Sequence, residues 1–86
     1  MKHEKKNTYI VLQGMIDGSG VGNLKEVARF TDKKKAIKYF NRIKNDESGW
    51  TKSGILTTEV ELCNYDESGY LFYEETIERH EKKWTL

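Results

Sequence analysis

The alternation of apolar and polar residues predicts four strands and one helix. The segment "TYIVLQGMI" (residues 8–16) has apolar side chains on both of its alternating sets, which is typical of a central strand with both faces covered. A second strand is predicted at residues 24–30, a third at 55–65 and a fourth at 70–80. The third strand places Leu56, Thr58, Val60 and Leu62 on one side and Glu59, Glu61 and Cys63 on the other.

The helix is predicted in "TDKKKAIKYFNRIKND" (residues 31–46). Thr31 or Asp32 provides the side-chain oxygen that caps the first backbone amides of a helix. An apolar stripe at helical spacing follows, formed by Ala36, Ile37, Phe40 and Ile43.

The order of elements, ββαββ, predicts an α+β fold. Two hairpins joined by a helical crossover give a four-stranded antiparallel sheet in the order 2-1-3-4, with the helix packed on one face. We expect residues 1–86 to form a single domain, with residues 1–7 as a flexible lead and no assignment for the tail at 81–86. The uncovered face is predicted to be apolar near the first strand and acidic toward the last two: it carries Tyr9 or Val11 together with Glu59, Glu61, Phe72, Glu74 and Glu78.

A glycine-rich stretch, "DGSGVGNLK" (residues 17–25), joins the first two strands and raises the question of phosphate binding. Its glycines, Gly18, Gly20 and Gly22, do not have the spacing of the dinucleotide or phosphate-loop motifs, and a strand follows where a phosphate site requires a helix N-terminus. We therefore predict a flexible hairpin loop; contact of its backbone amides with an anion or a partner is the alternative.

The residues available for catalysis or metal binding are few. Cys63 and His80 fall on the same predicted face of neighbouring strands, so a thiol–imidazole pair is conceivable. However, Glu59, Glu61 and Asp66 surround the cysteine in sequence and would raise the pKa of its thiol, whereas a nucleophile needs a lowered one. We expect no enzymatic activity, no metal site and no cofactor. The sequence shows neither a secretory signal nor a long apolar span, so we expect a cytoplasmic protein without membrane association.

The charge is strongly polarised although the net charge is only +1. Residues 1–44 hold 11 Lys and Arg against 4 Asp and Glu, a balance of +7, and residues 45–86 hold 4 against 10, a balance of −6. Lys34, Lys38 and Arg42 lie one helical turn apart and opposite the apolar stripe, which predicts an exposed basic ridge. A solvated surface, an acidic protein partner and nucleic acid are three interpretations of this ridge.

The favoured function is a small protein–protein interaction module, an accessory or inhibitory protein of a phage or mobile element. An uncovered apolar sheet face favours burial against a partner protein or a second copy, which predicts a homodimer. The predicted contact residues are Lys34, Lys38, Arg42, Tyr9, Val11, Phe72 and Trp84. The alternative function is nucleic-acid binding through the basic ridge.

Overall fold

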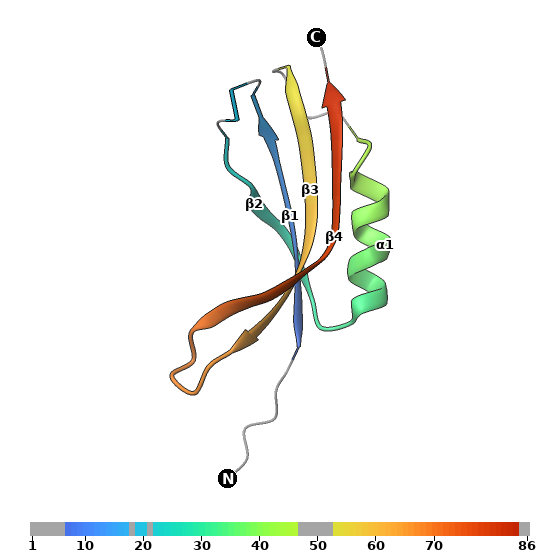
Figure 1. The fold of residues 1–86 in the computed structure, drawn as a ribbon. Helices are drawn as coiled ribbons and strands as arrows, with labels where there is room; N and C mark the ends of the chain where they lie inside the picture. Colours follow the sequence, from blue (N-terminus) through green and yellow to red (C-terminus); the bar gives the residue numbers. More distant parts are fainter. Residues whose placement is uncertain (1–6, 18, 21, 47–52, 85–86) are drawn as a thin grey trace.

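The protein forms a four-stranded antiparallel sheet with one helix in a computed structural model, which describes residues 7–17, 19–20, 22–46 and 53–84 (Figure 1). The elements are β1 (Thr8–Ile16), β2 (Lys25–Phe30), α1 (Lys33–Ile43), β3 (Gly54–Tyr65) and β4 (Leu71–Trp84). The strand order is β2-β1-β3-β4. The α+β class, the order 2-1-3-4 and the central position of the first strand are therefore as predicted, while β4 runs four residues beyond the predicted end at residue 80 and includes part of the tail that the sequence left unassigned.

Asp32 is the N-cap of helix α1 and is one of the two candidates, Thr31 and Asp32, that the sequence offered. The Asp32 carboxylate accepts a hydrogen bond from the backbone N–H of Lys34 at 2.9 Å, and its carbonyl accepts the first helical bond, from Ala36 N–H at 3.1 Å. The bond to Lys34 satisfies one of the donors that a helix N-terminus otherwise leaves without a partner. At the other end, the N–H of Lys44 donates to the carbonyl of Phe40.

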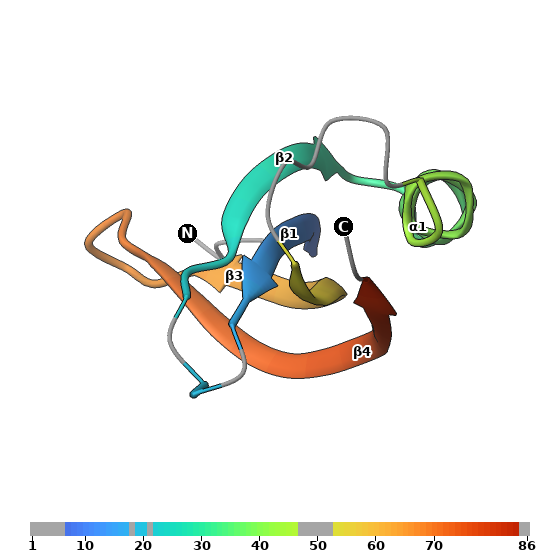
Figure 2. The same ribbon diagram turned by 90° about the horizontal axis from the view of Figure 1, so that it is seen from above.

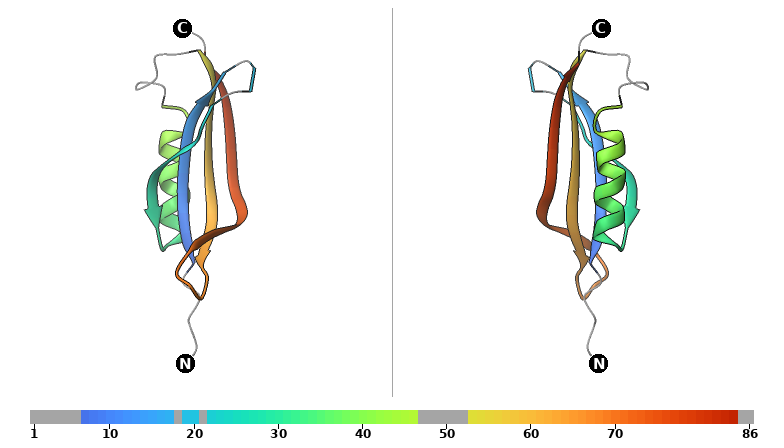
Figure 3. Two further views of the ribbon diagram at one scale, coloured as in Figure 1. Left: turned by 90° about the vertical axis from the view of Figure 1, so that its left-hand side faces the viewer. Right: turned by 90° about the vertical axis from the view of Figure 1, so that its right-hand side faces the viewer.

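The core lies between α1 and one face of the sheet. Ala36 and Phe40 of the helix pack onto Tyr9 and Val11 of β1 and Val60 of β3. Figure 2 shows why one short helix covers this face: β2 and β4 both curl toward the side on which α1 lies. The side views show α1 running along the strands and close to β2 (Figure 3).

This core corrects the prediction that Tyr9 or Val11 lies on an uncovered face. Val11 is fully buried and Tyr9 is 9% exposed, and both pack beneath the helix. In register with them across β3 are Val60 and Leu62. The acidic residues Glu59 and Glu61 lie on the opposite face, hereafter the far face, as alternation along β3 requires.

Irregularities in strand pairing change the faces of β2 and β4. The β1–β2 register shifts between Val11 and Leu12, so that Ala28 pairs with Val11 but Glu26 pairs with Leu12. The β3–β4 register shifts between Val60 and Glu61 and again between Leu62 and Cys63. A bulge adds a residue to one strand and breaks the two-residue alternation, so residues three apart come to share a face.

The β3–β4 hairpin is longer than the rest of the sheet. The last β1–β3 pair is Thr8 with Cys63, whereas β3 and β4 remain paired to Tyr65 and Leu71. Residues 64–72 thus form a two-stranded ribbon that projects beyond β1, on the side away from α1 (Figures 1 and 2). Together with Tyr73, where the ribbon joins the sheet, they are hereafter called the hairpin tip.

Candidate interaction surfaces

The far face of the sheet is covered by its own charged side chains. Ile10 and Cys63 are fully buried there, although no helix lies over them. Arg29 forms an ion pair with Glu26 at 2.8 Å and donates to the Tyr65 hydroxyl at 2.8 Å. The β2 bulge makes this ion pair possible, because Glu26 and Arg29, three residues apart, both face the same side as Leu12 and Ile10.

A second polar group covers the β3–β4 side of the far face. Arg79 pairs with Glu59 and, at 2.9 Å, with Glu81, and the Thr76 hydroxyl donates to Glu61 at 2.8 Å. The aliphatic parts of such side chains cover apolar groups while their charged ends stay in water. The prediction of an uncovered apolar patch beside the first strand is therefore wrong. Without that patch, the far face gives no reason to expect a second copy of the chain there.

Glu59 and Glu61 form a pair of buried carboxylates that the sequence did not single out as a pair. They are 7% and 8% exposed, and they share the far face because they lie two residues apart on one strand. Burial raises the pKa of Glu61, and its neighbour Glu59 raises it further, while the hydrogen bond from Thr76 opposes the shift. No group of three or more potential metal ligands occurs among the described residues.

The suggested thiol–imidazole pair does not form. Cys63 lies on the far face in register with Tyr73, whereas His80 is in register with Thr58 on the helix side, so the two side chains lie on opposite faces. Burial, followed by the charge of Glu61, raises the pKa of the Cys63 thiol to about 11. The expected direction of this shift is confirmed, and a thiol with this pKa is protonated at neutral pH.

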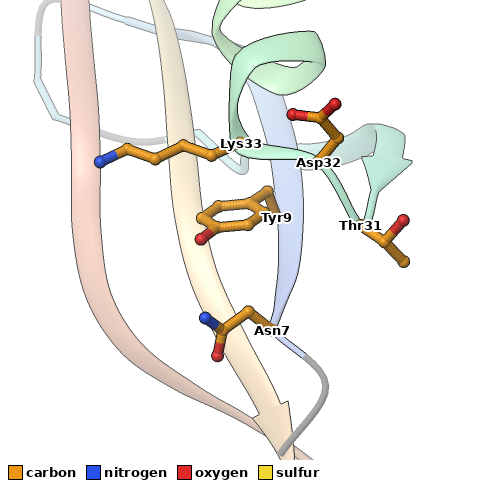
Figure 4. A pocket seen from close by; sticks show the side chains of 5 residues that line it. All are labelled: Asn7, Tyr9, Thr31, Asp32 and Lys33. Carbon is orange, nitrogen blue, oxygen red and sulfur yellow. The ribbon is translucent and has the colours of Figure 1, made fainter.

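A hollow of about 630 Å³ lies at the start of α1, lined by Asn7, Tyr9, Thr31, Asp32 and Lys33 (Figure 4). Lys33 extends beside the Tyr9 ring, while Thr31 points away from it. The polar groups here serve the fold: the Asp32 carboxylate caps the helix, and Asn7 Oδ1 accepts a hydrogen bond from Asn64 at 3.2 Å. Neither Cys63 nor His80 lines this hollow.

The basic ridge is present as predicted. Lys34, Lys38 and Arg42 are exposed, and α1 carries no acidic residue. Within the described part of the chain, no carboxylate lies within ion-pair distance of any of the three. Tyr39, which the sequence did not single out, lies beside the ridge, with its ring 4.9 Å from the Arg42 guanidinium and 5.6 Å from the ring of Phe30. Its position three residues before Arg42 is the signal that could have identified it.

Exposed aromatic side chains gather on the hairpin tip. Tyr65, Tyr70, Phe72 and Tyr73 are 48%, 74%, 41% and 57% exposed. Phe72 was a predicted contact residue, but it lies on the projecting ribbon and not on the open sheet. The ribbon is held in shape by Asp66, whose carboxylate accepts from the N–H groups of Ser68 and Tyr70, both at 2.9 Å.

The remaining predicted residues do not lie together on one surface. Gly20 has a φ of 83°, the left-handed conformation that favours glycine in a turn. Gly22 instead lies against the backbone of β1, where an added Cβ would meet the carbonyl oxygen of Met15. Gly18, the side chain of Trp84 and residues 1–6 of the predicted lead lie outside the described residues.

The fold and these surfaces define a small α+β protein with a basic helix on one side and an acidic, aromatic hairpin on the other. No family model, curated protein or solved structure matches this chain. No helix within the described ranges has the length and apolar character needed to cross a membrane.

Proposed function

We propose that this protein is a non-enzymatic protein-binding module that contacts its partner through the hairpin tip. The observation that carries the proposal is the exposure of four aromatic side chains on a ribbon that takes no part in the core. Tyrosine and phenylalanine bury large areas on binding and are enriched where protein interfaces gain most of their affinity. A cluster of them in water is unfavourable unless a partner covers it.

The braced base of the ribbon also supports this function. Arg29 bonds to Tyr65, and Asn7 bonds to Asn64, so side chains of β2 and of the segment before β1 hold the ribbon where it leaves the sheet. A ribbon held in one orientation loses less entropy on binding than a flexible loop does.

The absence of catalysis is part of the proposal. It is supported by the placement of Cys63 and His80 on opposite faces and by the raised pKa of the thiol. We also propose a cytoplasmic accessory or inhibitory protein of a phage or mobile element, which rests on small size and a composition rich in Lys, Glu, Asn, Ile and Tyr.

Photo-crosslinking from the tip tests the function. A benzophenone amino acid at position 70 should join the protein to one partner of defined mass in the native cytoplasm, and the same group at position 83 should not. The double variant Tyr70→Ser/Phe72→Ser should lose affinity capture of that partner. Val27→Ser is the matched control, because Val27 is 42% exposed, like Phe72, but lies on β2. Undiminished capture by the double variant would overturn the proposal.

Nucleic-acid binding by the basic ridge is the second candidate. The observation that favours it is the exposure of Lys34, Lys38 and Arg42 on a helix without acidic residues. Titration of labelled duplex and single strands at ~50 mM and ~200 mM salt should then show steeply salt-dependent binding. The triple variant Lys34→Glu/Lys38→Glu/Arg42→Glu should abolish it. If the wild-type chain does not bind even at the lower salt concentration, this candidate is eliminated.

A further inference from the structure

A groove between α1 and the end of β2 has an aromatic floor and a basic rim. Its volume is about 710 Å³, and it is lined by Phe30, Lys35, Lys38, Tyr39, Asn41 and Arg42. The Tyr39 ring contacts both Phe30 and Arg42. Its centre lies 5.6 Å from the centre of the Phe30 ring and 4.9 Å from the Arg42 guanidinium. Three of the six lining side chains are cationic, so an occupant with both apolar and acidic groups fits the groove best.

The groove continues across the helix surface. A second hollow, of about 570 Å³, shares Lys38 and Asn41 with the first and adds Lys33, Lys34 and Ile37. The two hollows together form a basic surface that lies against α1, hereafter the basic groove.

The hairpin tip of the same chain has the complementary chemistry. The tip holds Asp66 and Glu67, the two residues that follow it are Glu74 and Glu75, and residues 65–75 contain no Lys or Arg. Tyr70 and Phe72 stand among them, exposed. Within one molecule the tip points away from α1, as Figures 1 and 2 both show, so it does not reach its own groove.

We propose that the hairpin tip of one copy docks into the basic groove of a second copy. Tyr70 and Phe72 pack against the floor formed by Phe30 and Tyr39, and the carboxylates of the tip face Lys35, Lys38 and Arg42. This inference rests on the proposed function of the tip as a protein-binding surface and names a partner for it. The contact joins two different surfaces, so two reciprocal contacts close a dimer, and contacts that do not close extend into a chain of copies.

A complementation experiment tests this arrangement. The tip variant Tyr70→Ser/Glu67→Lys keeps its groove, and the groove variant Lys38→Glu/Arg42→Glu keeps its tip. By sedimentation velocity on nuclease-treated protein, we expect the wild-type chain to associate with concentration and to dissociate as salt is raised. Each variant alone should associate at least about tenfold more weakly, because charge reversal places like charges across the contact.

The mixture of the two variants is the decisive sample. One intact tip and one intact groove meet only when the two variants combine, so an equimolar mixture should recover association that neither variant shows alone. Val27→Ser is again the control and should associate like the wild-type chain. A wild-type chain that stays monomeric, or variants that each associate normally, would overturn the inference.

Failure of this inference can be distinguished from failure of the proposed function. If the wild-type chain is monomeric but crosslinking from position 70 still captures a foreign partner, the tip remains a protein-binding surface and only the second copy is excluded as its occupant. If crosslinking from position 70 fails and the mixture also fails, both are overturned.

Discussion

Gln13, on the central strand, is bonded to Ile43 at the end of the helix. The Gln13 Nε2 group donates to the carbonyl oxygen of Ile43 at 3.1 Å and to the hydroxyl oxygen of Thr58 at 3.0 Å. The last carbonyls of a helix have no partner within the helix, so this amide satisfies part of that need and fixes where α1 ends against the sheet. Because Gln13 is only 9% exposed, water does not readily replace it.

We therefore expect Gln13→Met to lower the free energy of unfolding by about 1–2 kcal/mol, since it removes a buried donor without a large change in volume. The Ile43 carbonyl keeps its second bond, from Asp46 N–H at 3.0 Å, which limits the loss. Urea unfolding measures the change. The double variant Gln13→Met/Thr58→Val also removes the hydroxyl that accepts from Gln13. It should lose less free energy of unfolding than the sum of the losses of the two single variants. An additive result would contradict the coupling.

The fold was predictable from sequence because its signals are local and agree with one another. The apolar stripe at helical spacing predicts the helix, Thr31 or Asp32 predicts its start, and the apolar residues on both sides of β1 predict its central place. The stripe consists of Ala36, Ile37, Phe40 and Ile43. The basic ridge followed from the same helical spacing.

The faces of the sheet were not predictable in the same way. Alternation along β4 groups His80 with Thr76 but does not say which of the two sets faces the side of Cys63. Cys63 is in register with Tyr73, so His80 falls on the other face, and the register shift between Val60 and Glu61 separates Thr76 from His80. The bulges arise from contacts between strands far apart in sequence, so no local pattern reveals them. Phe72 was predicted as a contact residue, but the projection of the tip beyond the sheet was not. Tyr70 and Phe72 alternate like residues of a half-buried strand, and only the shorter β1 leaves that part of the hairpin without cover.

Gly22 should tolerate substitution less well than Gly20. An alanine Cβ at Gly22 would meet the Met15 carbonyl and lie 2.9 Å from the Ile16 Cα, so strand β1 or the loop must move. At Gly20 there is open space, and the cost is the left-handed φ of 83° alone. We expect losses in unfolding free energy of about 1–3 kcal/mol for Gly22→Ala and about 1 kcal/mol for Gly20→Ala. Gly20→Asn should lose less than Gly20→Ala, since asparagine accepts this conformation. Equal losses at the two positions would contradict the contact with β1.

The raised pKa of Glu61 predicts a pH dependence of stability. The folded protein binds more protons than the unfolded chain between the usual value of 4.5 and the raised pKa, so the free energy of unfolding falls as the pH rises through that window. Glu61→Gln keeps the oxygen that Thr76 bonds and removes the charge. We expect this variant to be more stable than the wild-type chain at pH 7, by up to about 1 kcal/mol, and the difference to shrink toward pH 4.

Urea unfolding from pH 4 to pH 8 measures this difference. Glu67→Gln, the same change at an exposed carboxylate of the tip, is the control and should leave the pH profile close to that of the wild-type chain. A Glu61→Gln variant whose advantage grows as the pH falls would show that the sign of the shift is wrong.

The Cys63 thiol should be unreactive in the native protein. Its pKa of about 11, against the usual 9.0, lowers the thiolate fraction about a hundredfold at pH 8, and its side chain is fully buried. We expect a disulfide reagent at pH 8 to modify Cys63 at least about a hundredfold more slowly in native protein than in urea. The control is Ser68→Cys in a Cys63→Ala background, which places a thiol on the exposed hairpin tip and should react at the rate of an unfolded cysteine. Native Cys63 reacting as fast as this control would contradict both its burial and its raised pKa, and would remove that support from the non-enzymatic function.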